Sequence, residues 1–170
     1  MYDQITENKR NSWLLVIVIT VFLVLLGYLI GEYWGRGYGY GGIVFALVIA
    51  LISGLTSYYG GAGMILALSR AKRIEKKDNP QLFNVIDELS IAAGVPMPAV
   101  YIIDDSAPNA FATGRDPGHA SVAITTGLLE KLNRDELQGV MAHELSHVQN
   151  RDILFSMMVG IMVGSIVLIS

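Results

Sequence analysis

The 170-residue sequence contains no cysteine. This absence excludes disulfide frameworks, thiolate zinc sites and cysteine nucleophiles, and it is consistent with a reducing compartment. Charge is also scarce, because Asp, Glu, Lys and Arg together make up 16 % of the residues, against roughly a quarter in an ordinary soluble domain. The formal net charge of −3 is too small to indicate nucleic-acid binding, so we expect no nucleic acid among the partners.

Three long stretches have no charged residue at all, namely 11–31, 37–69 and 153–170. A helix of about 20 apolar residues crosses the ~30 Å hydrocarbon layer of a bilayer, and none of the three shows the polar stripe of a core helix. We therefore predict membrane spans at about 12–31 and 42–68, and a third over 153–170. The alternative for the first stretch, a signal peptide, is disfavoured because the apolar run is long and no small-residue cleavage site follows it.

Basic residues near the span ends predict the orientation of the first two spans. Five of them follow the second span directly, and they are Arg70, Lys72, Arg73, Lys76 and Lys77. Lys9 and Arg10 precede the first span, whereas the Tyr- and Gly-rich connection contains only Arg36. Because cytoplasmic loops are enriched in Lys and Arg, residues 1–69 are expected to form a hairpin of the cytoplasmic membrane with both ends in the cytosol.

Glycine recurs every fourth residue at Gly27, Gly31, Gly35 and Gly39. Close helix packing is one use of this spacing. General permissiveness in a chain with 18 glycines is the alternative, and the sequence leaves the two open.

Residues 70–152 are the part of the chain with soluble character. A helix is predicted to begin at Asp78 or Asn79, just before Pro80, and to end at Gly94, because apolar residues recur between them at helical spacing. Strands are predicted at 98–104 and at 120–125, the second at a sheet edge. The segment 105–119, with two prolines and two glycines, is expected to be loop, and a short helix follows the second strand.

The next predicted helix contains His143, Glu144 and His147 in the pattern His-Glu-x-x-His. It begins at Asn133, and Glu136 three positions on completes a capping-box pattern. At about 100° per residue the two histidines lie about 40° apart on one face, away from the apolar stripe of Leu137, Met141, Leu145 and Val148. Two neutral imidazoles can bind Zn²⁺ while the intervening Glu takes a proton from the attacking water. The alternative is two surface histidines with a local hydrogen bond to Glu.

A catalytic zinc ion normally has a third protein ligand, and the motif does not supply it. Glu136 lies about 10 Å further along the helix axis, which is too far. His119, in the loop after Asp116, would have to fold back to reach the site. The favoured explanation is a Glu or His on a helix beyond Ser170, which makes the sequence the N-terminal portion of a longer protein.

The chain resembles the HtpX family of membrane zinc metalloproteases, which are integral membrane gluzincins related to the CAAX prenyl proteases. The resemblance rests on two N-terminal spans and a basic segment, then "NAFATGR", "VAITTGLL" and "AHELSHVQNRD" in that order, then a further span. It implies a multi-pass α-helical membrane protein with a small α+β zincin-like cytosolic segment, residues 70–152, that carries the HExxH helix.

The resemblance also implies one Zn²⁺ per complete chain, with His143 and His147 as zinc ligands and Glu144 as the catalytic general base. The family's third ligand is a Glu on a helix after the third span. The expected activity is cleavage of misfolded or damaged membrane proteins in quality control, so polypeptide substrates and the lipid bilayer are the expected partners.

Three further residues are candidates for the substrate cleft. Asn109, Phe111 and Val122 lie where a zincin would bind an extended peptide along a sheet edge, although turn chemistry after Pro108 also explains Asn109. Asn150 either orients a zinc ligand or caps the helix.

Two other functions compete with the protease. A non-catalytic membrane scaffold would retain the motif with an incomplete metal site. A transporter is disfavoured, because none of the three predicted spans contains an ionisable acidic or basic residue of the kind that marks an ion path. The pattern predicts no particular oligomeric state.

Overall fold

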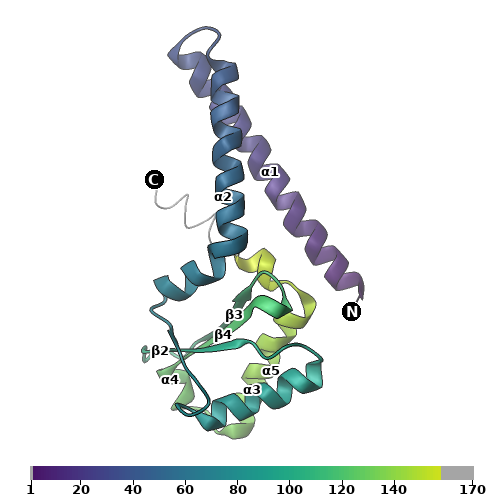
Figure 1. Ribbon diagram of the computed structural model, residues 1–170, viewed down its shortest axis with the longest axis vertical. Coiled ribbons are helices and arrows are strands. Elements are labelled where there is room, and N and C mark those ends of the chain that lie inside the picture. Colours follow the sequence, from purple (N-terminus) through teal and green to yellow (C-terminus); the bar gives the residue numbers. More distant parts are fainter. Residues whose placement is uncertain (1, 158–170) are drawn as a thin grey trace.

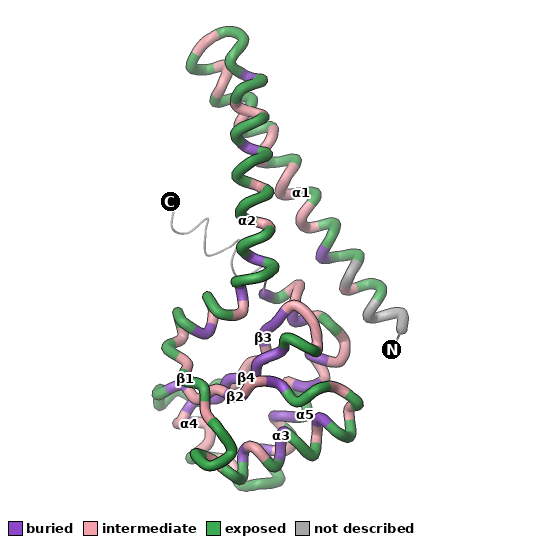
Figure 2. The backbone as a smooth tube through the Cα atoms, in the orientation of Figure 1, coloured by how far each residue is buried: buried purple, intermediate pink, exposed green. Residues whose placement is uncertain are grey.

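The computed structural model describes residues 2–157 and consists of a long helical hairpin that projects from an α+β body (Figure 1). Helix α1 (Tyr2–Trp34) and helix α2 (Gly39–Leu68) form the hairpin. Thr6–Trp34 and Gly39–Leu68 are both long and apolar enough to cross a membrane, and Figure 2 shows that most of their surface is exposed. The two helices predicted at 12–31 and 42–68 are therefore present and longer than predicted. The predicted third span, at 153–170, lies mostly outside the described residues.

The body contains a four-stranded sheet with the order β1-β2-β4-β3. Its strands are β1 (Lys72–Arg73), β2 (Ala99–Ile103), β3 (Ala110–Gly114) and β4 (Ala120–Thr125). β4 runs parallel to β2 and antiparallel to β3. The strand predicted at 120–125 is present, but its predicted place at the sheet edge is wrong, because β4 lies between two neighbours and all six of its residues are buried. The prediction of loop throughout 105–119 is also wrong, because 110–114 forms the edge strand β3.

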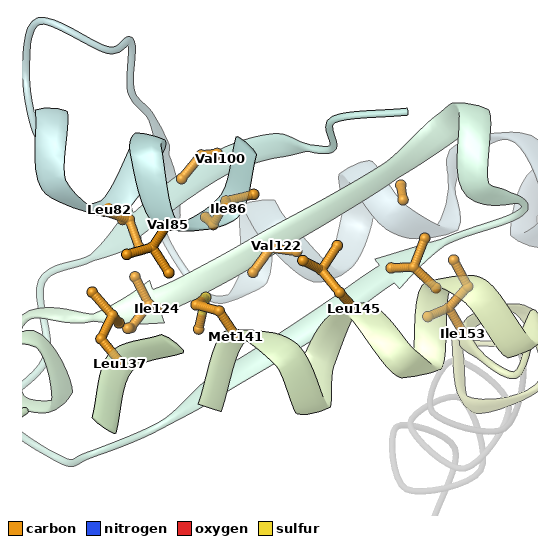
Figure 3. Close-up of a cluster of buried hydrophobic side chains, with 12 residues drawn as sticks. Leu82, Val85, Ile86, Val100, Val122, Ile124, Leu137, Met141, Leu145 and Ile153 are labelled. Atoms are coloured by element: carbon orange, nitrogen blue, oxygen red, sulfur yellow. The ribbon is translucent and has the colours of Figure 1, made fainter. Parts of the chain in front are cut away.

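One face of the sheet is covered by helices α3 (Pro80–Ala93) and α5 (Arg134–Asn150). Figure 3 shows their apolar side chains meeting those of β2 and β4. Leu82 and Ile86 of α3, Ile124 of β4 and Met141 of α5 are each at most 1 % exposed. Burial of such a side chain stabilises the fold by about 1.5–3 kcal/mol, so this layer is the main core of the body.

The ends of both covering helices form as their sequences predict. The Asn79 side chain accepts the Leu82 N–H at 3.0 Å, and Pro80 takes the first helical position. Gly94 ends α3 at φ +67°, a conformation that favours glycine. Asn133 and Glu136 form the predicted capping box of α5. The short helix α4 (Thr126–Leu129) precedes them.

The opposite face of the sheet contacts the end of the hairpin. Leu66 of α2 forms a buried cluster with Ile103 and Ala123, and Phe111 of β3 packs against it. Because α2 reaches the sheet beside β3, the hairpin and the edge strand are fixed to each other.

Candidate metal centre

Helix α5 is anchored by its apolar stripe. Leu137, Met141, Leu145 and Val148 are all at most 2 % exposed and belong to the main core. His143 is exposed, and Glu144 and His147 are half-buried. The helical period therefore places the predicted metal-site residues off the core-facing side, as expected.

The two imidazoles converge. The Nε2 atoms of His143 and His147 are 3.3 Å apart, and the ring planes cross at 80° with their centroids 4.7 Å apart. Both nitrogen atoms thus point toward one small volume beside the helix. This is the arrangement in which one cation can take both imidazoles as ligands.

Asp152 fixes the ring of His147. Its Oδ2 lies 2.9 Å from the Nδ1 atom of His147. Because the carboxylate accepts the Nδ1 proton, the Nε2 atom keeps its lone pair for a metal ion. The Oδ1 atom of Asp152 is buried and has no hydrogen-bond partner among the described residues. The burial limits how far this carboxylate can rotate away from His147.

Asp152 is not indicated by the sequence pattern, which indicated Asn150 as a candidate for the same role. On a continued helix Asp152 would lie about 140° from His147. The helix ends instead at Arg151, which adopts a left-handed conformation with φ +58° and turns the chain back. The backbone carbonyl of Asn150 accepts the Asn8 side-chain N–H at 3.2 Å, which links the end of α5 to α1.

Glu144 is held by the edge strand. The backbone N–H of Ala112 in β3 donates to its Oε2 at 3.1 Å. This hydrogen bond joins two elements that are 32 residues apart in the chain. The carboxylate is therefore positioned beside the imidazole pair and against the sheet edge.

The three predicted cleft residues have different surroundings. Asn109 is exposed and precedes β3, where its backbone N–H donates to Thr125 Oγ1 at 2.9 Å. Phe111 is half-buried and packs toward α2. Val122 is 1 % exposed within the main core, so its side chain is not available to a substrate. The sheet edge that contacts Glu144 belongs to β3 and not to β4.

His119 pairs with Asp116 and not with the motif histidines. Its Nδ1 atom lies 2.9 Å and 3.0 Å from the two carboxylate oxygens of Asp116. Burial raises the pKa of the Asp116 carboxyl, but the hydrogen bond and charge of His119 outweigh it, so the net pKa lies below its ordinary value. Asp116 therefore stays ionised near neutral pH, and its carboxylate holds the His119 ring through Nδ1.

The donor set fits part of a zinc site. Two imidazoles whose Nε2 atoms converge, with a carboxylate behind one of them, match the donors that zinc takes in enzymes. Within residues 2–157 no cluster of three His, Asp or Glu side chains is arranged to hold a metal ion. The described residues thus supply two ligands, and a third protein ligand would have to come from outside them.

A helix-borne His-Glu-x-x-His beside the edge strand of a small sheet defines the class of HExxH metallopeptidases. The family model of peptidase family M48 matches residues 76–170. This match covers more than half of the chain, and the chain belongs to that family.

Its curated relatives are HtpX homologues, as the sequence motifs indicate. The chain is 46 % identical over 170 residues to "Protease HtpX homolog" of Lactobacillus helveticus, which covers 100 % of this chain and 57 % of that protein. It is 41 % identical over 170 residues to the Streptococcus pneumoniae homologue, with 100 % and 56 % covered. The chain therefore spans about half the length of the curated relatives it matches.

The fold resembles that of a solved structure. The crystal structure of S. mikatae Ste24p superimposes with a TM-score of 0.50 at 20 % sequence identity, over 98 % of this chain and 39 % of that one. At this identity the likeness concerns the fold. It covers the two long apolar helices as well as the α+β body.

Proposed function

We propose that this chain supplies the membrane hairpin and the catalytic helix of a zinc-dependent endopeptidase of the cytoplasmic membrane. The observation that carries the proposal is the convergence of the His143 and His147 Nε2 atoms at 3.3 Å beside a Glu144 that is hydrogen-bonded to an edge strand. The family resemblance supports the further proposal that the substrates are misfolded or damaged membrane proteins.

His143 and His147 would hold Zn²⁺, and the HtpX resemblance supports a Glu from a later helix as the third ligand. A bound Zn²⁺ supplies Lewis acidity toward the scissile carbonyl and lowers the pKa of the attacking water. Asp152 keeps His147 in the tautomer that can bind a metal ion, through its 2.9 Å contact with Nδ1.

Glu144 performs the proton transfers in this proposal. It accepts a proton from the attacking water and later donates one to the leaving amine of the cleaved peptide bond. The Ala112 N–H, 3.1 Å from Oε2, fixes the carboxylate and leaves Oε1 for these transfers. General acid–base catalysis of this kind contributes about 10²–10⁴-fold to the rate.

The substrate chain would add to β3 as a further strand. Asn109 and Thr125 form a hydrogen-bonded pair at the start of the β3–β4 ladder, so the backbone groups of Ala110, Ala112 and Gly114 point to the outer edge. The Ala112 N–H is taken by Glu144, which leaves the Ala112 carbonyl and the groups of Ala110 and Gly114 for the substrate. Main-chain hydrogen bonds along such an edge give affinity for an extended peptide with little side-chain selectivity. A quality-control protease needs that breadth.

Aromatic residues support the placement of the hairpin in the bilayer. Trp13 and Trp34 of α1 are 69 % and 84 % exposed, and at 1.5 Å per residue they lie about 31 Å apart. Tyr40 at the start of α2 and Tyr58 in its C-terminal half lie about 27 Å apart in the same way. These distances match the ~30 Å hydrocarbon layer, with Trp and Tyr at its two interfaces. We place residues 70–152 in the cytosol, and 153–170 in a third span.

The proposal is tested with Glu144→Gln and His143→Ala in the complete protein. Glu144→Gln keeps size and the hydrogen bond with Ala112 but cannot act as a base, so cleavage of casein should fall about 10²-fold or more while bound zinc is retained. His143→Ala should lose zinc and cleavage together. Zinc content and cleavage are measured on the same detergent-solubilised samples.

A second candidate is a non-catalytic membrane scaffold, which the two-ligand site among the described residues favours. The same experiment separates the two. A scaffold would bind no stoichiometric zinc and would show no casein cleavage that depends on Glu144. Near-normal cleavage by the zinc-loaded Glu144→Gln protein would contradict the role of Glu144 as the base.

A further inference from the structure

A cavity of about 1270 Å³ lies where the hairpin meets the body. Figure 1 shows that α1 and α2 diverge toward the body and leave a fork there. The cavity is lined by α1, α2, the loop after α3, the segment that follows β3, and the end of α5. It is separate from the metal centre, because none of its lining residues belongs to the His-Glu-x-x-His motif.

The end of the cavity between α1 and α2 is apolar. Val16 of α1 and Leu47, Leu51 and Leu55 of α2 line it. Leu51 and Leu55 are 64 % and 51 % exposed, so they are open to whatever fills the fork. A surface of this kind, on helices placed in a bilayer, fits a hydrocarbon chain.

The end of the cavity near the body is cationic. Arg115 and Arg151 both line it. The guanidinium carbon of Arg115 lies 5.9 Å and 5.3 Å from the ring centroids of Tyr58 and Tyr59, which hold it against α2. Asp116 lies 3.5 Å from Arg115 Nε but is also paired with His119. One shared carboxylate does not neutralise two guanidinium groups, so an anion fits this end.

The two ends meet at the level of a membrane interface. Trp13, Tyr58 and Tyr59 line the cavity. Trp13 lies in the N-terminal half of α1, and Tyr58 and Tyr59 lie in the C-terminal half of α2, which are the halves nearer the body. Trp and Tyr concentrate at the depth of lipid headgroups. The change from apolar to cationic lining therefore occurs where a phospholipid of the cytosolic leaflet changes from acyl chain to phosphate.

We propose that this cavity binds an anionic phospholipid, with an acyl chain between α1 and α2 and the phosphate at Arg115 and Arg151. The proposal rests on the membrane placement given under the proposed function, and it is independent of the catalytic roles. Guanidinium groups suit phosphate because their N–H donors match its oxygens. The lipid would join the hairpin to the segment that directly follows the edge strand β3.

The test uses the complete protein in detergent, titrated with phosphatidylglycerol or phosphatidylcholine and observed by native mass spectrometry. We expect phosphatidylglycerol to bind preferentially. Arg115→Gln should reduce that preference about tenfold or more, because a charge-assisted hydrogen bond is lost, and Arg115→Lys should keep most of it. The matched control is Arg73→Gln, an exposed cation of the basic segment outside the cavity lining.

A second pair of variants tests the apolar end. Gly54 lines the cavity, and a Cβ there meets nothing within 4 Å, so Gly54→Phe should fill the fork and abolish binding of both lipids. Gly63 of the same helix is equally open but lies outside the lining, so Gly63→Phe should bind lipid normally.

Several outcomes would overturn the lipid site. They are undiminished phosphatidylglycerol binding by Gly54→Phe, equal binding of the two lipids by the unaltered protein, and full displacement by inorganic phosphate, which would indicate a free anion. Absence of bound lipid with cross-linking of Leu51 to a polypeptide would assign the cavity to a protein segment. Membrane insertion and casein cleavage are followed in parallel, so a failure of the proposed function is distinguishable from a failure of the lipid site.

Discussion

Asp152 is five residues beyond His147 in the chain, and it contacts that histidine because the helix stops between them. The backbone of Arg151 is strained at φ +58°, because a non-glycine residue seldom adopts this backbone region. The strained turn returns the carboxylate to the imidazole. We therefore propose that the strained turn at Arg151 serves to hold Asp152 against His147, the proposed metal ligand.

Replacing Asp152 with Ala is expected to weaken zinc binding by the complete protein about 10–100-fold, because the acceptor that fixes the His147 tautomer is lost. The measurement is competition for zinc with a chelator of known affinity. Asp104→Ala is the matched control, because Asp104 is an exposed carboxylate in the loop after β2. Unchanged zinc affinity in Asp152→Ala would show that the ring of His147 is oriented by something else.

The hairpin is held together by glycine at its contact surface. A Cβ atom at Gly42 would collide with the backbone carbonyl of Gly27, and one at Gly31 would collide with the carbonyl of Tyr38. The two helices thus approach at backbone distance over Gly27, Gly31, Gly39 and Gly42. The recurrence of glycine at every fourth residue left two explanations open, close helix packing and general permissiveness. Close packing applies to this part of the hairpin.

Gly42→Leu should therefore separate α1 from α2 and lower the unfolding temperature of the solubilised protein, whereas Gly41→Leu should not. A Cβ at Gly41 meets nothing within 4 Å, so the neighbouring position offers a control with the same change in hydrophobicity and helix propensity. The measurement is thermal unfolding in one detergent, with protease accessibility of the 35–38 turn as a second readout. Equal unfolding temperatures would mean that the α1–α2 contact contributes little to stability.

β3 is the element of the site whose structure departs most from the sequence-based prediction. Its sequence, Ala-Phe-Ala-Thr-Gly, has little β-branched character and is bounded by turn residues, so local propensity favours a loop. Pairing with β4 makes it a strand and gives Glu144 its N–H donor from Ala112. The same pairing moves β4 to the interior and buries Val122.

At the scale of the whole molecule, the hairpin and the metal centre are connected through the sheet. Leu66 at the end of α2 packs with Ala123 of β4 and Phe111 of β3. On the other side of the sheet, α5 presents the histidine pair. The candidate metal centre and the end of the hairpin therefore lie on opposite faces of the same small sheet. In the proposed function this arrangement suits substrates that reach the site from the bilayer.

The proposed orientation predicts where reporter fusions are active. A fusion at Gly39, in the hairpin turn, should report the outside of the cytoplasmic membrane, and a fusion at Asn84, in α3, should report the cytosol. The basic residues at 70–77 are the physical reason, because cationic segments stay on the cytosolic side. Alkaline phosphatase and green fluorescent protein fused at each position measure this directly. An external signal at Asn84 would contradict both the orientation and the lipid site.

The sequence by itself determined the features that depend on local periodicity. The two apolar helices, the start of α3 at Asn79, the capping box at Asn133 and the shared face of His143 and His147 all follow from residues within a few positions of one another. Local hydrogen bonds and the 3.6-residue helical repeat are sufficient to fix them, so the placement of the two histidines on one helix face was predictable.

Only the tertiary structure decided the features that join distant segments. The order β1-β2-β4-β3, the strand character of β3 and the bond from Ala112 to Glu144 depend on pairings across many residues, for which short sequence windows carry no signal. Asp152 is close to His147 in sequence, yet its role required the left-handed turn at Arg151, because helical periodicity alone points it away. Contacts made by chain reversal and strand pairing are set by the packing of the whole molecule.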